Sequence, residues 1–285
     1  MAGVVGSGMW KLLLHTGYGR AISGGFRSHF YKEIGCLPGS VICGSLIKAR
    51  QHEEQETRLL VYGDPHGNYA PLIDACSAKR PDAMLIAGDM TAPKDEPERI
   101  RPIRSELAEL LEEDIEIIWT HGNHDTDSPE IHDATFESFP EGHLHGGVRT
   151  LKSSGLRVAA LGGVFRGQIW YPEMHYEDPA RYQCPETFLQ EKDCAWRGGL
   201  PLRHRSSIFP SDAERIKQIG ADILLTHEAP SAVSPHGFLA LDQLADDMGA
   251  KVIFHGHHHI SYADELMNGI QVRGLGLAEP VRVYV

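Results

Sequence analysis

The stretch "RLLVYGDPHGNYAPLIDACSAKRPDAMLIAGD", residues 58–89, decides the fold. It begins and ends with a short apolar run of the kind that forms a buried strand. Between the two runs, residues 68–80 have the pattern of a helix, with Asn68 as the expected N-cap. Each apolar run ends in Gly-Asp, which places Asp64 and Asp89 at strand ends. The stretch therefore predicts a strand, a helix and a second, parallel strand.

The same alternation continues along the chain. Residues 96–114 are predicted to be helical, with Pro102 at the start of the helix or at a kink, and residues 115–125 form a third strand. Later segments repeat the pattern as helix 211–220, strand 221–230, helix 239–249 and strand 251–259. Alternating strands and helices predict a largely parallel sheet that is covered by helices.

Two segments depart from this alternation by forming antiparallel strands. Residues 149–163 are predicted to form a hairpin. The tail, residues 263–285, is expected to form two or three antiparallel strands, with Asn268-Gly269 as a type I′ turn.

Residues 165–210 show no clear period and allow two interpretations. They form either a substrate-capping insertion or an ordinary solvated loop with a small satellite core. In the first case, arginines would bind phosphate oxygens and aromatic rings would stack on a planar group. Arg166 is the strongest substrate-binding candidate because it follows a predicted strand end. The full set is Arg166, Arg181, Arg197, Arg203 and Arg205, with Trp170, Tyr171, Tyr176, Tyr182 and Trp196.

The composition restricts the class of protein. The chain has 285 residues, 41% of them hydrophobic, and a net charge of -12. An acidic chain has no general attraction to nucleic acid or to anionic membranes, and no apolar run reaches the roughly 18 residues that span a bilayer. The five cysteines include no CxxC pair, which argues against a disulfide framework and a cysteine zinc site. This usage suits a reducing compartment, and we expect a cytoplasmic location.

The first 50 residues differ from the rest of the chain. They contain six Lys or Arg and one acidic residue, a net charge of 6 - 1 = +5, so residues 51–285 carry -12 - 5 = -17. Such a segment is either an extension with little fixed structure or an organelle transit peptide. We therefore treat residues 1–57 as an N-terminal extension and expect the fold in residues 58–285.

Polar residues with metal-binding side chains follow five of the predicted strands. Because the carboxyl ends of parallel strands share one edge of a sheet, these side chains are expected to converge. Asp and His bind borderline divalent metals such as Mn, Fe, Zn or Co. A site for two such ions needs a bridging carboxylate, for which Asp89 is well placed. The candidate ligands are Asp64, His66, Asp89, Asn123, His227, His257 and His259.

The segment "HGHHHISY", residues 255–262, supplies two of these ligands. In an extended segment His257 and His259 point to one side, whereas His258 points away and is expected to be structural. His255 is expected to be a core or supporting histidine.

Each candidate also has an ordinary role. Asp64 and Asp89 are suited to helix caps, a lone His66 or His227 to a hydrogen-bonded core, and Asn123 to a turn. The whole set in one ordered pattern favours a metal site.

The ordered motifs D-x-H, GD, GNHD, H and GHxH resemble the calcineurin-like metallophosphoesterase superfamily over residues 58–262. The resemblance implies a four-layer α/β/β/α sandwich of two mixed sheets with a dinuclear metal site. It also implies hydrolysis of phosphoesters, with His124 as the unliganded catalytic histidine. One metal would be held by Asp64, His66, Asp89 and His259, and the other by Asp89, Asn123, His227 and His257.

The motifs differ from those of protein serine/threonine phosphatases, which carry GDxxDRG and GNHE. Here the second aspartate is absent and the third motif ends in Asp125, so the acid that orients His124 is Asp95 or Asp125. The pattern is closer to bacterial phosphodiesterase-like members, including class III cyclic-nucleotide phosphodiesterases.

Three functions remain open. They are a phosphodiesterase or phosphatase for a small or nucleotide-like substrate, a nuclease subunit with a protein partner, and a non-catalytic scaffold that binds protein. The substrate, the native metal and the oligomeric state are not defined by the sequence, and Mn²⁺ is the expected activator in vitro.

Overall fold

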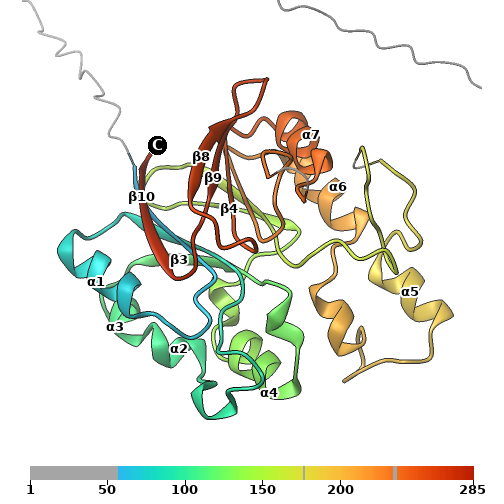
Figure 1. Cartoon of the computed structure of the whole chain (residues 1–285), viewed down its shortest axis with the longest axis horizontal. Helices are drawn as coiled ribbons and strands as arrows, with labels where there is room; N and C mark the ends of the chain where they lie inside the picture. Colours follow the sequence, from blue (N-terminus) through green and yellow to red (C-terminus); the bar gives the residue numbers. More distant parts are fainter. Residues whose placement is uncertain (1–56, 176, 234–235) are drawn as a thin grey trace, which may run out of the picture. The chain divides into compact units, whose positions relative to one another are not determined.

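The computed structural model describes residues 57–175, 177–233 and 236–285. The predicted extension therefore lies outside the described residues, apart from Thr57. Two mixed β-sheets form the centre of the described part (Figure 1). The first has the order β10-β1-β2-β3, with β1 at Arg58–Gly63, β2 at Ala83–Ala87, β3 at Glu116–Thr120 and β10 at Glu279–Tyr284. Strands β1, β2 and β3 are parallel, and β10 pairs with β1 in the antiparallel direction.

The second sheet has the order β4-β5-β6-β7-β9-β8. Its inner strands β5, β6, β7 and β9 are parallel, and the two edge strands β4 and β8 are antiparallel. The strands are β4 at Gly147–Thr150, β5 at Arg157–Leu161, β6 at Ile223–Thr226, β7 at Val252–His255, β8 at Tyr262–Glu265 and β9 at Gln271–Gly274.

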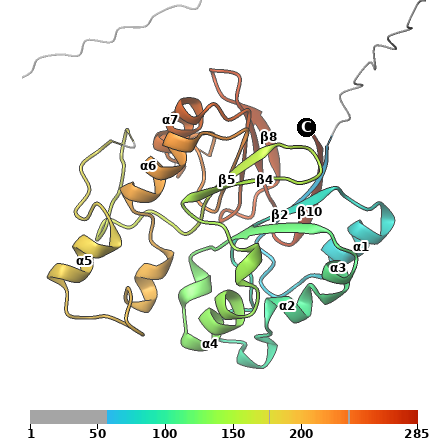
Figure 2. The same ribbon diagram turned by 180° about the vertical axis from the view of Figure 1, so that it is seen from behind.

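Helices cover the outer faces of both sheets, as the opposite views in Figures 1 and 2 show. The first sheet is covered by α1 at Ala70–Ala78, α2 at Ile103–Glu106 and α3 at Ala108–Glu112. The second is covered by α6 at Pro210–Ile219 and α7 at Leu239–Met248. Shorter elements are α4 at Pro129–His132, a π-helix at Asp133–Glu137, α5 at Pro185–Glu191, and 3₁₀ turns at Pro97–Arg99, His124–Thr126, Pro140–Gly142 and Leu202–Ser206.

Side-chain alternation along β1 shows why four layers form. Leu59 and Val61 are buried in a cluster between the two sheets, together with Phe254 of the second sheet. Leu60 and Tyr62 point to the other face and are buried against α1, α2 and α3. A strand that is apolar on both faces needs cover on both, so the sheets pack on each other and helices pack outside. The predicted four-layer α/β/β/α architecture is confirmed.

Helix α2 begins directly after Pro102, which is one of the two roles predicted for this proline, although the helical segment is shorter than residues 96–114. Two local predictions are wrong. Tyr69, rather than Asn68, occupies the N-cap position of α1 and makes no capping bond. The hairpin turn is not type I′, because Gly269 has a φ of 87° and Asn268 is not among the positive-φ residues. Gly269 N–H donates to the Leu266 carbonyl, so a type I turn precedes the left-handed glycine.

We predict that Phe254→Ala lowers the free energy of unfolding by about 3–5 kcal/mol, because it empties a fully buried position between the sheets. Urea denaturation measures this change. Met267→Ala is the control, since Met267 is fully exposed and its truncation is expected to change stability by about 0.5 kcal/mol or less. Equal effects of the two substitutions would contradict the layered core.

Candidate metal centre

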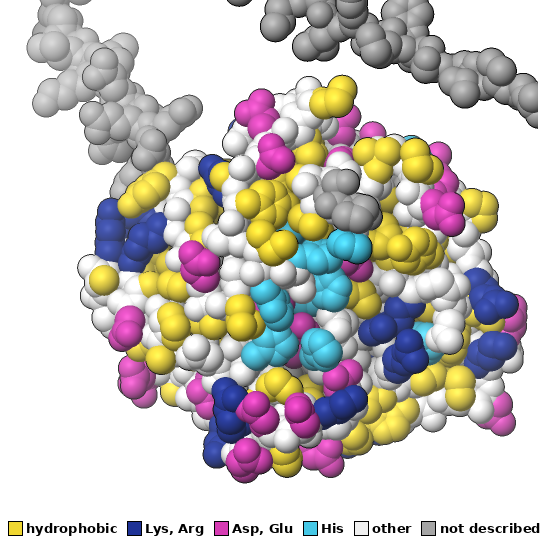
Figure 3. Space-filling view, in the orientation of Figure 1, with side chains coloured by type: hydrophobic (Ala, Val, Ile, Leu, Met, Phe, Trp, Pro, Cys, Tyr) yellow, Lys and Arg dark blue, Asp and Glu magenta, His cyan; other side chains and the backbone are white. Residues whose placement is uncertain are grey.

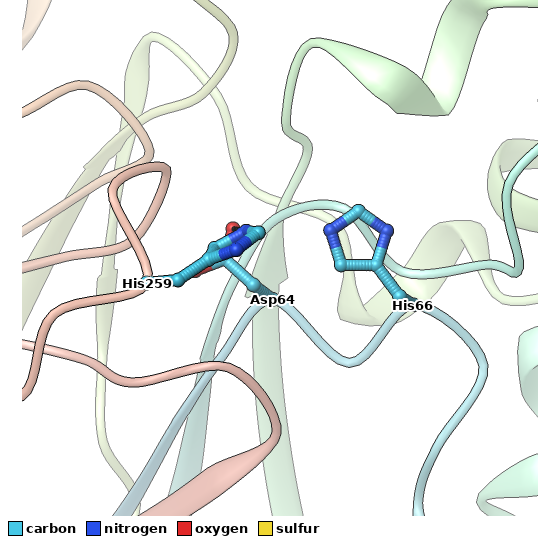
Figure 4. Close-up of side chains that lie close together, drawn as sticks. All are labelled: Asp64, His66 and His259. Carbon is cyan, nitrogen blue, oxygen red and sulfur yellow. Dashed lines mark ion pairs between the residues drawn. The ribbon is translucent and has the colours of Figure 1, made fainter.

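The candidate ligands lie in loops that follow β1, β2, β3, β6 and β7, and they meet at one edge of the two sheets. Ligand atoms of Asp64, Asp89 and His227 lie within 4.8 Å of one another, and so do those of Asp64, His66 and His259. Figure 4 shows the His259 ring against the Asp64 carboxylate, with the His66 ring beside them. The fold therefore brings together residues that are almost 200 positions apart in the sequence.

Asp89 lies between two of the histidines. Its Oδ2 atom is 3.7 Å from His66 Nε2 and 3.5 Å from His227 Nε2. Its Oδ1 atom accepts the His124 backbone N–H at 2.9 Å, which fixes the direction of the carboxylate. A side chain in this position has the geometry that a bridging carboxylate needs.

Both ring nitrogens of His227 have a neighbour. Nδ1–H donates to the Ala87 carbonyl at 2.8 Å, and Nε2 lies 3.0 Å from Asn123 Oδ1 on the side of the other candidate ligands. Burial by itself lowers the pKa of His227, but the charges of Asp89 and Asp64 outweigh burial and raise it. The chain thus surrounds this ring with negative charge that favours a cation.

His66 gives the most direct test of whether a metal fits. Both of its ring nitrogens are buried and have no hydrogen-bond partner among the described residues. Leaving a buried polar atom unpaired costs about 1–3 kcal/mol. A divalent ion between His66, Asp89 and Asp64 would provide the missing partner, so these residues fit such an ion.

Backbone strain is concentrated at the candidate ligands. Five of the seven have a positive φ, a conformation that costs a non-glycine residue about 1–3 kcal/mol. These residues are Asp64 (48°), His66 (43°), Asp89 (51°), His257 (72°) and His259 (55°).

The expectation of an extended segment at residues 257–259 is wrong. Strand β7 ends at His255, and the following turn uses left-handed residues because it has to fold back over Asp64. His257 N–H donates to both Asp64 carboxylate oxygens, at 3.0 and 3.1 Å. His258 does not point away either, since one of its ring nitrogens lies within 4.8 Å of Glu228 and His257.

Two glycines allow the backbone to approach the carboxylates. A Cβ atom at Gly122 would lie 2.1 Å from Asp89 Oδ1, and one at Gly256 would lie 2.6 Å from Asp64 Oδ2. Any side chain at either position would displace a candidate ligand. The glycines in GNHD and GHHH thus have a steric role.

The acid beside His124 is Asp127, and this residue was missed in the sequence. His124 Nδ1 is 2.8 Å from Asp127 Oδ2, and the His124 side chain is 51% exposed. Asp127 follows His124 by three residues, and the 3₁₀ turn His124–Thr126 brings the side chains of His124 and Asp127 together. The expected Asp125 is buried instead and accepts the N–H groups of Met90 and Gly122. Burial, and then the charge of Asp89, raises the pKa of Asp125 to about 7.

Glu228 is a second residue that was missed in the sequence, although it directly follows His227. It is buried, and its Oε1 atom is 3.8 Å from His257 Nε2. Its Oε2 atom accepts the Phe165 N–H at 3.2 Å. Burial raises the pKa of Glu228 to about 7. Glu228 thus adds a buried carboxyl group beside His257 and His258.

The structure divides the arginines and aromatics of residues 165–210 into two groups. Most of them hold the segment together. Arg197 pairs with Asp133, and Arg205 lies over the Trp196 ring at 4.7 Å. Trp170 and Tyr182 are buried in the core of the second sheet. Arg181 lies on the surface, and Tyr176 is outside the described residues.

Arg166, Arg203 and Tyr171 form the other group, which borders the candidate metal centre. Arg166 Nη2 donates to Ser206 Oγ at 3.0 Å, and its buried Nε has no hydrogen-bond partner among the described residues. Burial, and then the charge of Arg203, lowers the pKa of Arg166. Arg166, the predicted substrate-binding arginine, thus lies beside Asn123, and its Nε–H group is not hydrogen-bonded within the described residues.

His255 is a core histidine, in line with one of the two roles expected for it. It is 1% exposed, and its Nε2 is 2.6 Å from the Tyr262 hydroxyl. Burial lowers its pKa to about 4 from an unfolded value near 6.5. Between these two values the unfolded chain binds a proton that the folded chain does not, so the free energy of unfolding falls as pH falls.

We therefore predict that titration of His255 alone lowers the free energy of unfolding by about 3 kcal/mol as the pH falls from 6.5 to 4. The free energy of unfolding, measured by urea denaturation at several pH values, is expected to depend less steeply on pH in His255→Gln. An unchanged slope in this variant would show that His255 does not titrate as its burial implies.

A family model and a relative show which family the chain belongs to. The model of the calcineurin-like phosphoesterase family matches residues 57–261. An uncharacterized protein of Haemophilus influenzae is 40% identical over 207 residues, which are 72% of this chain and 84% of that protein. The chain belongs to the calcineurin-like phosphoesterase family.

Two solved structures match the chain at low sequence identity. The protein TT1561 of Thermus thermophilus matches with a TM-score of 0.50 and 13% identity, over 81% of this chain and 99% of that one. A dimetal phosphatase from Danio rerio matches with a TM-score of 0.48 and 11% identity, over 80% of this chain and 92% of that one. None of the helices in the described residues is both long enough and apolar enough to cross a bilayer.

Proposed function

We propose that this chain is a metal-dependent hydrolase of phosphoesters that acts on a small or nucleotide-like substrate. The observation that carries the proposal is the convergence of five candidate ligands, Asp64, His66, Asp89, His227 and His259, beside an exposed histidine with its own carboxylate partner. Family membership supports phosphoester chemistry, and the acidic charge of residues 51–285 argues against a nuclease subunit. The scaffold alternative is disfavoured because all seven ligand positions and His124 are present.

Two divalent ions are the proposed cofactors. Asp64, His66, Asp89 and His259 would hold one of them, and Asp89, Asn123, His227 and His257 would hold the other, from Mn, Fe, Zn and Co. When bound, such ions lower the pKa of a water molecule and offset the charge on the phosphoryl oxygens.

The remaining steps fall to the chain's own side chains. Arg166 binds a phosphoryl oxygen through guanidinium donors that are not used inside the protein. The Asp127 carboxylate binds His124 at Nδ1, which leaves Nε2 to donate a proton to the leaving oxygen.

We further propose that residues 58–285 are the phosphoesterase domain, that residues 1–57 are an extension, and that the protein works in the cytoplasm. The location rests on cysteine usage, because Cys76, Cys184 and Cys194 are free thiols in the structure.

We predict Mn²⁺-dependent cleavage of p-nitrophenyl phosphate, bis-p-nitrophenyl phosphate or both, which measures the preference for monoesters or diesters. His124→Ala is expected to lower kcat by about 10²–10⁴-fold, because it removes the general acid. Its metal content, measured by elemental analysis, is expected to stay at the wild-type value. Asp89→Asn is expected to lose both metal and activity, because a bridging ligand serves two ions.

Asp95→Asn is the matched control, since Asp95 is an exposed aspartate, whereas the side-chain partner of His124 is Asp127. A wild-type chain that binds metal but cleaves neither ester would favour the scaffold over the hydrolase. Full activity in His124→Ala would remove that residue from the mechanism.

We predict that Asp127→Asn lowers kcat by about 10–100-fold, because a hydrogen bond to a charged group contributes about 1.5–3 kcal/mol. The leaving group separates this role from a structural one. Because His124 gives a proton to the leaving oxygen, the loss in Asp127→Asn is expected to be larger for a phenyl ester than for the p-nitrophenyl ester, whose leaving group needs a proton less. Equal losses for the two esters, or a loss of the same size in Asp95→Asn, would contradict the assigned role.

A further inference from the structure

Two hollows of different character meet beside the candidate metal centre. The basic hollow, of 490 Å³, is lined by Lys94, Asp127, Arg203 and Leu202, among others. The aromatic hollow, of 380 Å³, is lined by Phe165, Tyr171, Phe238 and His257, among others. Asn123 and Arg166 line both of them. Figure 3 shows this face, with histidines gathered at its centre and basic and hydrophobic side chains around them.

The basic hollow carries positive charge that the protein does not neutralise. Its lining has three cations, Lys94, Arg166 and Arg203, and one carboxylate, Asp127, so the formal balance is 3 - 1 = +2. Asp127 is 2.8 Å from the His124 ring and 3.9 Å from Lys94 Nζ, so two groups share it. Neither Arg166 nor Arg203 forms an ion pair within the described ranges.

Three exposed arginines elsewhere on this acidic chain have carboxylate partners. Arg157 pairs with Asp222, Arg197 with Asp133 and Arg215 with Asp212. In the basic hollow, by contrast, three cations share the single carboxylate of Asp127. Like charges that converge in a cleft repel one another and attract an anion. Guanidinium groups bind phosphate through paired donors, which makes a phosphate group the best match.

The scissile phosphoryl group does not account for all of these cations. That group would lie at the candidate ligands, and Arg166 lies beside them because it lines both hollows with Asn123. Arg203 lines only the basic hollow, and its exposed side chain is directed to solvent there. Lys94 lines the same hollow, and its side chain is 63% exposed. These two cations are placed for a second anionic group.

The aromatic hollow offers a stacking surface on the other side of Asn123. The Tyr171 side chain is 53% exposed, although its ring lies 5.1 Å from the Phe238 ring. Phe238 is held in turn by Phe165, with ring centroids 4.6 Å apart. An exposed aromatic ring on a fixed support is suited to stack on a planar group such as a nucleobase.

We propose that the substrate is a nucleotide-like phosphoester that carries a second phosphate. Its scissile phosphate lies at the candidate metal centre, its second phosphate lies between Arg203 and Lys94, and its base stacks on Tyr171. This inference rests on the proposed phosphoesterase function and defines the substrate class for it.

Equilibrium binding tests the second phosphate without turnover. Metal-depleted full-length chain is titrated by calorimetry with adenosine 3′,5′-bisphosphate and with adenosine 5′-monophosphate. We expect the bisphosphate to bind about tenfold more tightly or better, and the difference to shrink as salt rises. Arg203→Ala is expected to remove most of the difference. Arg181→Ala removes the same charge from the same segment but away from both hollows, and is expected to keep it.

Rate measurements in the presence of Mn²⁺ extend the test to monoesters and diesters. The monoester pair is adenosine 5′-monophosphate and adenosine 3′,5′-bisphosphate. The diester pair is the dinucleotide ApA and its 5′-phosphorylated form. In the class that the enzyme cleaves, kcat/KM is expected to be about tenfold higher or more for the member with the additional phosphate. Arg203→Ala is expected to reduce this ratio toward one.

Tyr171 is tested separately with adenosine 5′-monophosphate and ribose 5-phosphate in the same binding experiment. Tyr171→Ala is expected to weaken binding of the nucleotide by about fivefold or more while changing that of the sugar phosphate less, because stacking contributes about 1–3 kcal/mol. Tyr171→Phe keeps the ring and is expected to keep the preference.

These experiments distinguish failure of the second-phosphate site from failure of the proposed phosphoesterase function. Equal affinity for the two adenosine phosphates, or a difference that Arg203→Ala leaves unchanged, overturns the second-phosphate site even if p-nitrophenyl esters are cleaved. Tight, Arg203-dependent binding without hydrolysis of any ester overturns the hydrolase and leaves a binding site for bisphosphorylated nucleotides. A preference that survives Tyr171→Ala overturns the stacking role.

Discussion

Two buried carboxylates at the ends of neighbouring strands are the constraint on which this structure depends. Asp64 and Asp89 are 0% and 1% exposed, and no lysine or arginine in the described ranges pairs with either. A buried charge without a partner is costly, so the surrounding groups must offset the charge of these carboxylates. Histidines and backbone N–H groups offset part of it, and a divalent ion would offset the rest. Burial opposes ionisation of Asp64, yet His259 and His227 outweigh it and lower its pKa.

The rest of the fold makes this arrangement stable. Apolar β1 and β2 are buried on both faces, and their parallel register brings both carboxylates to the same edge. Left-handed backbone at Asp64, Asp89 and His257 is strained, and it persists because packed strands and close glycine contacts leave the loops little freedom. Stability supplied by the three cores thus offsets strain and repulsion at the site.

Arginine has two roles on this acidic chain. Arg197 pairs with a carboxylate, and Arg205 donates to two carbonyls and lies over an aromatic ring. These contacts hold the segment of residues 165–210 in place. Arg166 and Arg203 have no carboxylate partner in the described part of the chain and face the edge where the candidate ligands meet. Arginines that are bound inside the protein therefore hold the segment beside the site in place, whereas arginines without a carboxylate partner are available to bind a ligand.

The sequence by itself determined the order of strands and helices, because alternation and apolar runs are local properties of a segment. It also indicated five of the side chains that lie together at the sheet edge, since each of them follows a strand. Only the tertiary structure decided that Asp127 rather than Asp125 contacts His124, because a 3₁₀ turn sets that geometry. It also decided the left-handed turn at His257, which has to fold over Asp64 from a distant strand. Such choices depend on long-range packing, which no local pattern records.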